Sequence, residues 1–155
     1  AVATTSAPTG VAATCSGHLE HADGYEEVLR DVAGRADSHP VLVAVREGRI
    51  VGSVTLTPFG SEHAEVARPG ELEFRFLGVA REAWRSGVAQ ALVAACEAAA
   101  QARGDRWLVI SVIDWNEPAH RLYSRLGFLR VPERDWEPVP GILLWVSRRP
   151  VGRAD

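Results

Sequence analysis

Short apolar runs bounded by turn residues predict the strands of a sheet. Residues 40–45 (P-V-L-V-A-V) and 50–57 (I-V-G-S-V-T-L-T) flank the turn Glu47-Gly48-Arg49, so we expect a β-hairpin. Residues 107–113 form a strongly apolar run, which is typical of a central strand. Two further strands are expected over residues 128–131 and 141–147, joined by a loop over 132–140.

The strand predicted over residues 71–79 alternates more regularly than the others. Its apolar side chains Leu72, Phe74 and Phe76 share one face, and Glu71, Glu73 and Arg75 share the other. The alternation breaks at Leu77-Gly78-Val79. A glycine inside a strand pattern indicates a bulge, so we expect the strand to be irregular there.

Apolar residues recur at helical spacing in three other segments, over residues 23–36, 88–103 and 116–126. Gly104 is the expected end of the second helix, and Asn116 and Gly127 are the expected cap and stop of the third. Strands and helices alternate, which predicts one α/β domain with a mixed sheet over residues 1–155. Within it, residues 1–17 are expected to be either disordered or an incomplete first strand.

Composition narrows the range of functions. The chain has 155 residues, 46% apolar and 24% charged, with a net charge of −3, which does not favour nucleic acid or an anionic membrane as a partner. No apolar run is long enough to span a membrane. The two cysteines, Cys15 and Cys96, cannot form a disulfide framework, and Cys96 lies on an apolar helical stripe. We therefore expect a cytoplasmic protein, and the scattered His and Cys residues predict no metal site.

The segment W-R-S-G-V-A, residues 84–89, combines residue types that bind phosphate at the start of a helix. Gly87 and Ala89 lack bulky side chains, so backbone N–H groups can approach an anion closely. Arg85 and Ser86 add a positive charge and a hydroxyl group at the same place. Taken alone, the segment is equally compatible with an ordinary glycine turn.

The stretch from Glu71 to Phe128 resembles the GCN5-related N-acetyltransferase (GNAT) family. That family's cofactor loop reads Gln/Arg-x-x-Gly-x-Gly/Ala after a strand that ends in apolar-x-Val. Here Leu77-Gly78-Val79 matches the strand end, and Gly87 and Ala89 match the loop. The family's later element, Asn-x-x-Ala-x-x-Leu-Tyr-x-x-x-Gly-Phe, is matched at Asn116, Ala119, Leu122, Tyr123, Gly127 and Phe128.

The chain also departs from the family pattern and carries one motif beyond it. Trp84 stands where the family usually has Gln or Arg, which bears on cofactor affinity more than on the assignment. The segment R-V-P-E-R-D-W-E-P-V-P-G, residues 130–141, looks like that of a subgroup of bacterial members, but its residues suggest no chemistry of their own.

The resemblance implies a GNAT-like α/β fold, with a mixed, mostly antiparallel sheet flanked by helices and splayed fourth and fifth strands. It implies transfer of an acetyl group from acetyl-CoA to a primary amine of a small molecule or protein by direct attack. Tyr123 would protonate the departing CoA thiolate, and Asn116 would contact the pantetheine arm. The rest of acetyl-CoA would be held by Leu77, Gly78, Val79, Trp84, Arg85, Ser86, Gly87, Val88 and Ala89.

The general base stays open at this point. Glu73 is the first candidate, because it lies on the strand beside the expected splay; a solvated strand face is the alternative reading of the same residue. Tyr123 likewise has an alternative, purely structural role, in which it packs its helix onto the sheet. The other candidate bases are Glu71, Asp114, a water molecule, His63 in a loop and His120 at an expected exposed helix position.

A second class of function is a non-catalytic acyl-CoA-binding or regulatory module on the same fold, because a fold does not fix a function. The acceptor amine cannot be named from the sequence. Acidic residues in the loops over residues 57–70 and 133–141 favour a cationic substrate. Many members of the family are dimers, so a homodimer is compatible with the resemblance.

Overall fold

The computed structural model describes residues 2–5 and 40–152, and the chain divides into two compact units. Of these described residues, those up to Thr57 and Phe74–Cys96 form the first unit, and Pro58–Glu73 with those from Glu97 onward form the second. The first unit contains β1 (Val2–Thr5), β2 (Val41–Arg46), β3 (Arg49–Pro58), most of β4 (Glu71–Val79), the 3-10 turn η1 (Arg81–Ala83) and the start of α3 (Val88–Arg103).

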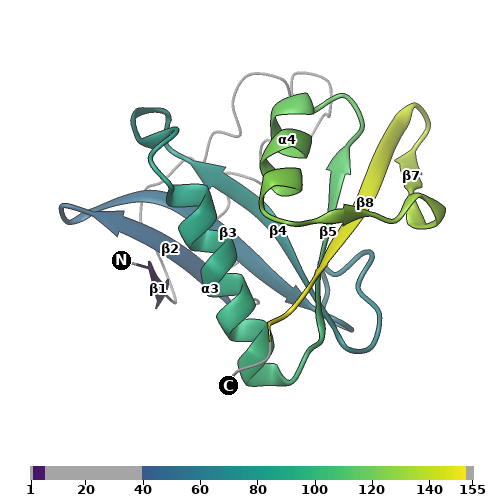
Figure 1. Cartoon of the computed structure of the whole chain (residues 1–155), viewed down its shortest axis with the longest axis horizontal. Helices are drawn as coiled ribbons and strands as arrows, with labels where there is room; N and C mark the ends of the chain where they lie inside the picture. The colour runs from purple at the N-terminus through teal and green to yellow at the C-terminus, as the bar shows by residue number, and fades with distance from the viewer. Residues whose placement is uncertain (1, 6–39, 153–155) are drawn as a thin grey trace. The chain divides into compact units, whose positions relative to one another are not determined.

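The strands of the first unit follow the order β1-β2-β3-β4 (Figure 1). β2 and β3 form the predicted hairpin, whose turn residues Glu47 and Gly48 both have positive φ, 51° and 75°. Such a pair of turn residues matches the twist of the flanking strands. β1 pairs antiparallel with β2, from Val2 opposite Ala44 to Thr5 opposite Val41, so a short strand exists within residues 1–17. The predicted helix over residues 23–36 and Cys15 lie outside the described residues.

The irregularity predicted at the end of β4 falls on Phe76. This residue has φ 56°, a left-handed conformation that is rare for a bulky side chain and costs free energy. Its ring is buried, and the Arg75 guanidinium lies 4.7 Å from the ring centroid. The strained residue therefore lies immediately before the Leu77-Gly78-Val79 segment, for which the irregularity was predicted.

A close approach of β3 and α3 explains the glycine in the middle of β3. A Cβ atom on Gly52 would lie 2.9 Å from Val88 Cγ1, 3.0 Å from the Gly78 carbonyl oxygen and 3.1 Å from Leu92 Cδ1. Val88 and Leu92 are both buried on the first turns of α3. The missing side chain thus lets the start of this helix lie directly on the sheet of the first unit.

The second unit contains β5 (Trp107–Ile113), α4 (Glu117–Arg125), β6 (Leu129–Arg130), η2 (Pro132–Arg134), β7 (Trp136–Val139) and β8 (Ile142–Pro150). Its strands follow the order β4-β5-β8-β6, with β7 also paired to β8 (Figure 1). The parallel ladder of β4 and β5 runs from Glu71–Trp107 to Glu73–Val109, and the other pairs are antiparallel. The mixed, mostly antiparallel sheet is confirmed.

The prediction of a plain loop over residues 132–140 is wrong. The segment forms the η2 turn and then β7, which pairs with β8 at Trp136–Leu144 and Val139–Ile142 across a register irregularity. Prolines lack the N–H that a ladder requires, so Pro132, Pro138 and Pro140 masked the strand signal in the sequence. Trp136 packs against the buried cluster of Val109, Val131 and Val146, and this apolar contact favours the strand.

The helix ends follow their predicted signals. Asn116 caps α4, because its side-chain Oδ1 accepts a hydrogen bond from the Ala119 N–H at 3.3 Å. Gly104 and Gly127, with φ 79° and 86°, follow the last turns of α3 and α4. Cys96 is fully buried on α3, as predicted, and this burial raises the pKa of its thiol to about 12.

Replacing Gly52 by Ala should destabilise the protein by about 1–3 kcal/mol, because the added methyl group overlaps atoms of α3 and of the β4 backbone. Chemical denaturation followed by circular dichroism measures the loss. Ser53→Ala at the next position is the matched control, because it removes an atom from a site where Ser53 Oγ has no hydrogen-bond partner among the described residues. A Gly52→Ala variant as stable as Ser53→Ala would contradict the close approach.

Candidate active site

The predicted phosphate loop of the first unit has the backbone of an anion-binding turn. Arg85 and Gly87 both have left-handed φ, 57° and 82°, and both are exposed. The Ala91 N–H donates to the Gly87 carbonyl, so α3 begins immediately after the loop. The N–H groups of a first helical turn lack partners within the helix, and the first turn of α3 carries no acidic residue. This arrangement favours a bound anion.

A second arginine lies at this loop. Arg46, the last residue of β2, donates a hydrogen bond to Ser86 Oγ at 2.9 Å, and Ser86 Oγ donates to the Ala83 carbonyl. The hydroxyl therefore links the hairpin of β2 and β3 to the loop and brings a guanidinium group to it. Sequence reasoning missed Arg46, because nothing in the sequence places the end of this hairpin beside a loop forty residues later.

Trp84, which departs from the family pattern, is held in position by a hydrogen bond. Its indole N–H donates to the Val79 carbonyl at 2.9 Å. The residue is 42% exposed, and the Arg81 guanidinium lies 5.4 Å from the centroid of its ring. The indole therefore fixes the end of β4 to the loop that follows. It also occupies one acceptor position of Val79, whose backbone is predicted to pair with the pantetheine.

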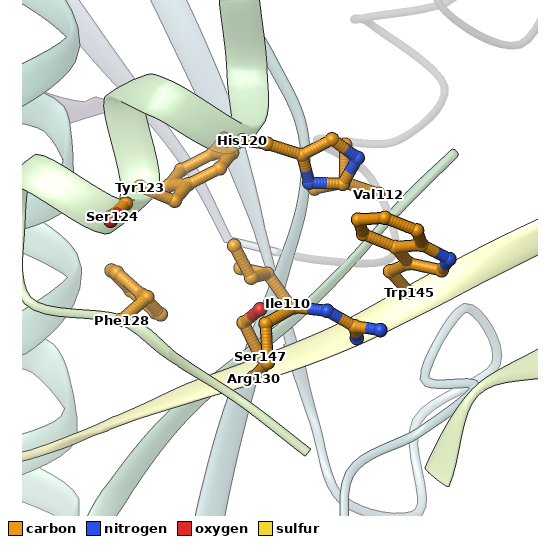
Figure 2. Close-up of a pocket in the computed structure, with 9 residues that line it drawn as sticks. All are labelled: Ile110, Val112, His120, Tyr123, Ser124, Phe128, Arg130, Trp145 and Ser147. Atoms are coloured by element: carbon orange, nitrogen blue, oxygen red, sulfur yellow. The ribbon is translucent and has the colours of Figure 1, made fainter. Parts of the chain in front are cut away.

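Tyr123 and its neighbours line a pocket of about 200 Å³ in the second unit (Figure 2). Tyr123 is half-buried on α4 and meets the buried ring of Phe128 edge-on, with the centroids 5.5 Å apart. Most of the lining side chains are apolar or aromatic. The pocket is formed by Ile110, Val112, His120, Tyr123, Ser124, Phe128, Arg130, Trp145 and Ser147.

His120 lines the same pocket one helical turn before Tyr123, so the expected exposed position is wrong. Its Nε2 lies 3.0 Å from the Ile113 carbonyl oxygen and 3.1 Å from that of Asp114. Its ring lies 4.8 Å from that of Trp145. The turn between β5 and α4 therefore fixes the orientation of the imidazole ring.

Arg130, which lines this pocket, forms a bidentate ion pair with Asp135. Arg130 donates two hydrogen bonds to the Asp135 carboxylate, at 2.7 and 2.8 Å, and one to the Val146 carbonyl at 3.0 Å. The hydrogen bonds that Arg130 and the Val146 N–H donate to the Asp135 carboxylate hold its pKa below the usual range. The Arg130 guanidinium also lies 4.2 Å from the Trp145 ring, so the pair supports the pocket wall.

Glu73, the predicted base, is fully buried, so the alternative of a solvated strand face is wrong. Its Oε2 accepts hydrogen bonds from the N–H groups of Glu65, Val66 and Ala67 at 2.8, 3.0 and 3.1 Å. Protonation of Oε2 would oppose these three donors. The carboxylate therefore holds the loop before β4 in place. The alternation of residues in the sequence predicts which face of the strand a side chain lies on, but it does not predict which groups bind that side chain.

Glu71 is also buried, and its partner, Arg134, belongs to the segment over residues 130–141. Arg134 donates to both carboxylate oxygens, at 2.8 and 2.9 Å, and to the Val66 carbonyl, while the Arg68 N–H donates to Oε2. Burial alone would raise the pKa of Glu71, but the hydrogen bonds from Arg134 and Arg68 and the nearby charges hold that pKa below its usual range. The motif over residues 130–141 is thus a set of ion pairs that fixes two loops.

The predicted site residues fall into two groups. The residues from Leu77 to Ala89 lie in the first unit, and Glu73, Asn116 and Tyr123 lie in the second. Within the described residues, no group of three or more His, Cys, Asp or Glu side chains is placed to hold a metal ion. No helix in the same part of the chain is long and apolar enough to cross a membrane.

Comparison with known proteins identifies the family. The model of the acetyltransferase (GNAT) family matches residues 11–128, so the chain belongs to this family of acyl-CoA-dependent acetyltransferases. A search of curated proteins found no significant match.

Solved structures show the same fold. A GNAT-family protein from Desulfovibrio desulfuricans aligns with a TM-score of 0.70 at 22% identity, over 98% of this chain and 100% of that one. An IAA acetyltransferase from Bacillus cereus aligns at 0.60 and 16%, over 78% and 83% of the two chains. A ribosomal-protein-alanine N-acetyltransferase from Brucella melitensis aligns at 0.56 and 23%, over 83% and 77%.

Arg134→Met should destabilise the protein by about 3–5 kcal/mol at pH 7, because it leaves the buried Glu71 carboxylate without its two strongest donors. The folded-state pKa of Glu71 is lowered, so the pair stabilises the fold fully above the ordinary pKa of a glutamate side chain and less as the pH falls through the lowered pKa. Denaturant titrations at several pH values should therefore show the difference from wild type narrowing in acid.

Arg148→Met is the matched control for this experiment. Arg148 lies 3.8 Å from the same Glu71 oxygen, but its side chain is 38% exposed, so its loss should cost about 1 kcal/mol or less. Equal losses for the two variants, or a loss for Arg134→Met that does not depend on pH, would contradict the assigned role of the buried pair.

Proposed function

We propose that this protein is an N-acetyltransferase that transfers the acetyl group of acetyl-CoA to a primary amine of a small molecule or protein. The observation that carries the proposal is the pocket beside Tyr123, on a helix whose cap Asn116 and stop Gly127 stand at the family's spacing. The nitrogen of the amine attacks the thioester carbon, and the C–S bond breaks. The products are an N-acetylated amine and free CoA.

The loop before α3 is the proposed site for the pyrophosphate of acetyl-CoA. The unpaired N–H groups of the first helical turn, which includes Val88 and Ala89, would donate to the phosphate oxygens. Arg85 is exposed and would add a charge-assisted contact. Leu77, Gly78 and Val79 would pair with the pantetheine through their backbone, and the Trp84 indole would hold that strand end in place.

Tyr123 is the proposed donor of the proton that neutralises the CoA thiolate. A phenol is a suitable acid for a thiolate, because its proton is transferred readily once the C–S bond breaks. The Asn116 Oδ1 accepts the hydrogen bond of the helix cap. The two N–H groups of the same amide are the donors proposed for the pantetheine carbonyls.

The acceptor is proposed only as a class. Glu62, Glu65 and Glu133 are exposed, which supports a cationic acceptor, although Asp135 is already paired with Arg130. The proposed protein is bacterial and cytoplasmic and acts without a metal, a membrane or nucleic acid. A homodimer is compatible with this proposal. The second candidate, a non-catalytic acyl-CoA-binding module, is favoured by Trp84 and disfavoured by the pocket beside Tyr123.

Tyr123→Phe should lower kcat by about 100-fold or more and leave the KM for acetyl-CoA unchanged, because only the proton donor is removed. Release of CoA thiol, measured with a chromogenic reagent across a panel of amines, gives both constants. Arg121→Ala is the control, because Arg121 is exposed on α4 and pairs only with Glu117 among the described residues. Unchanged turnover in Tyr123→Phe would refute the assignment of the donor, and acetyl-CoA binding without turnover on any amine would favour the non-catalytic module.

Arg85→Ala should raise the KM for acetyl-CoA about 10-fold, because it removes a charge-assisted contact to the pyrophosphate. Acetyl-pantetheine has no pyrophosphate, so the variant and the wild type should use it equally well. If Arg85→Ala lowers the rate by the same factor with acetyl-CoA and with acetyl-pantetheine, Arg85 does not act on the pyrophosphate.

A further inference from the structure

His120 carries a hydrogen-bond arrangement that the proposed function does not use. Both partners of its Nε2 are backbone carbonyl oxygens, those of Ile113 and Asp114, and a carbonyl can only accept. Nε2 therefore carries the proton. In the neutral ring the lone pair is then on Nδ1, and none of the described hydrogen bonds uses that atom. An imidazole oriented in this way is a base with its accepting atom already set.

The accepting side of the ring belongs to the pocket. Figure 2 shows the imidazole between Tyr123 and Trp145, with the nitrogen next to its point of attachment, Nδ1, on the side of Ile110. Residues three apart on a helix lie on the same face, so His120 and Tyr123 project from α4 together. A base and an acid from one helix face thus line a single pocket.

We propose that His120 is the general base of the acetyl transfer and takes the proton of the acceptor amine at Nδ1. The inference rests on the proposed function and supplies the base that the sequence left open. It also makes the pocket beside Tyr123 the site of the reacting nitrogen. The acceptor is then a primary amine whose nitrogen and adjacent carbons enter apolar walls formed by Ile110, Val112, Phe128 and Trp145.

The proton and electron balance of the step is complete with these two side chains. The neutral amine attacks the thioester carbon, and the new C–N bond places a positive charge on nitrogen. That nitrogen passes one proton to Nδ1, the C–S bond breaks with its electron pair on sulfur, and the Tyr123 hydroxyl protonates the thiolate. The imidazolium then returns the proton to the tyrosinate through solvent, which restores both groups.

The charges around the ring are compatible with this role. Arg130, from β6, lines the same pocket, but its charge is matched by the Asp135 carboxylate. The Trp145 ring from β8 and the carbonyl oxygens of Ile113 and Asp114, which are uncharged, also lie against the imidazole ring. Apolar walls disfavour an ammonium ion, so they promote the neutral amine that the attack requires.

Glu73 is the competing base, and the two residues can be separated by matched variants. His120→Gln keeps an N–H donor for the two carbonyls but has no group that titrates near neutral pH. Glu73→Gln removes the carboxylate that holds the loop over Glu65–Ala67. Each variant is assayed at saturating acetyl-CoA between about pH 5 and about pH 9, an interval that includes the range in which an unperturbed imidazole changes charge.

If His120 is the base, kcat of the wild type rises with a slope of one on the acidic side, and His120→Gln loses this limb and about 100-fold in kcat. Its KM for acetyl-CoA and its thermal unfolding stay near the wild-type values. Free imidazole should restore part of the rate to His120→Ala. Glu73→Gln should keep the acidic limb, because its defect is one of loop position and stability.

A His120→Gln variant that keeps its rate, or that loses rate but retains the acidic limb, overturns the inference, as does loss of the limb in Glu73→Gln alone. These outcomes leave the proposed function in place, because the wild type still turns over. A wild type that binds acetyl-CoA and acetylates no amine overturns the proposed function, and the base assignment falls with it.

Discussion

The buried carboxylates at the start of β4 are the constraint on which the second unit depends. Glu71 and Glu73 are 4% and 0% exposed, and two charges removed from water are costly unless donors surround them. Their donors come from the loop before β4 and from η2, so the two side chains bind both of these segments to β4. The same residues begin the parallel ladder with β5, where β4 enters the sheet. Satisfying these charges therefore also sets the start of the strand that ends at the proposed cofactor site.

This constraint gives the C-terminal motif a physical meaning. Arg134 binds Glu71, Arg130 binds Asp135, and the Asp135 carboxylate accepts the Val146 N–H. Each arginine presents two parallel donors to a carboxylate, the geometry in which Arg cannot be replaced by Lys without loss. The motif thus holds the β6–β7 connection against β8, and the wall of the Tyr123 pocket with it. Its charged residues are engaged in these ion pairs, which explains why they suggested no chemistry in the sequence.

Local signals allowed most of the fold to be predicted. The hairpin turn at Glu47-Gly48, the cap at Asn116 and the stops at Gly104 and Gly127 act within a few residues, so the sequence alone indicates them. The family motifs led to the loop before α3 and to Tyr123 for the same reason.

What the sequence could not indicate depends on distant partners. Glu73 alternates like a solvated residue, yet it is buried because three backbone N–H groups of a loop converge on it. Arg46 reaches Ser86 only because the β2–β3 hairpin lies beside the loop in the folded unit. β7 forms despite its prolines, because Trp136 joins a cluster assembled from β5, β8 and the segment after β6. His120 lines the pocket because the turn after β5 binds its ring.

In the proposed reaction, one acetyl group passes from acetyl-CoA to an amine in the pocket beside Tyr123. The most direct measurement is the molar ratio of CoA thiol released to N-acetylated product formed, with the product identified by mass spectrometry. We expect a ratio of one for at least one amine of the panel, and a parallel decrease of both products in Tyr123→Phe. Thiol release without an acetylated amine, or acetyl-CoA binding with neither product, would contradict it.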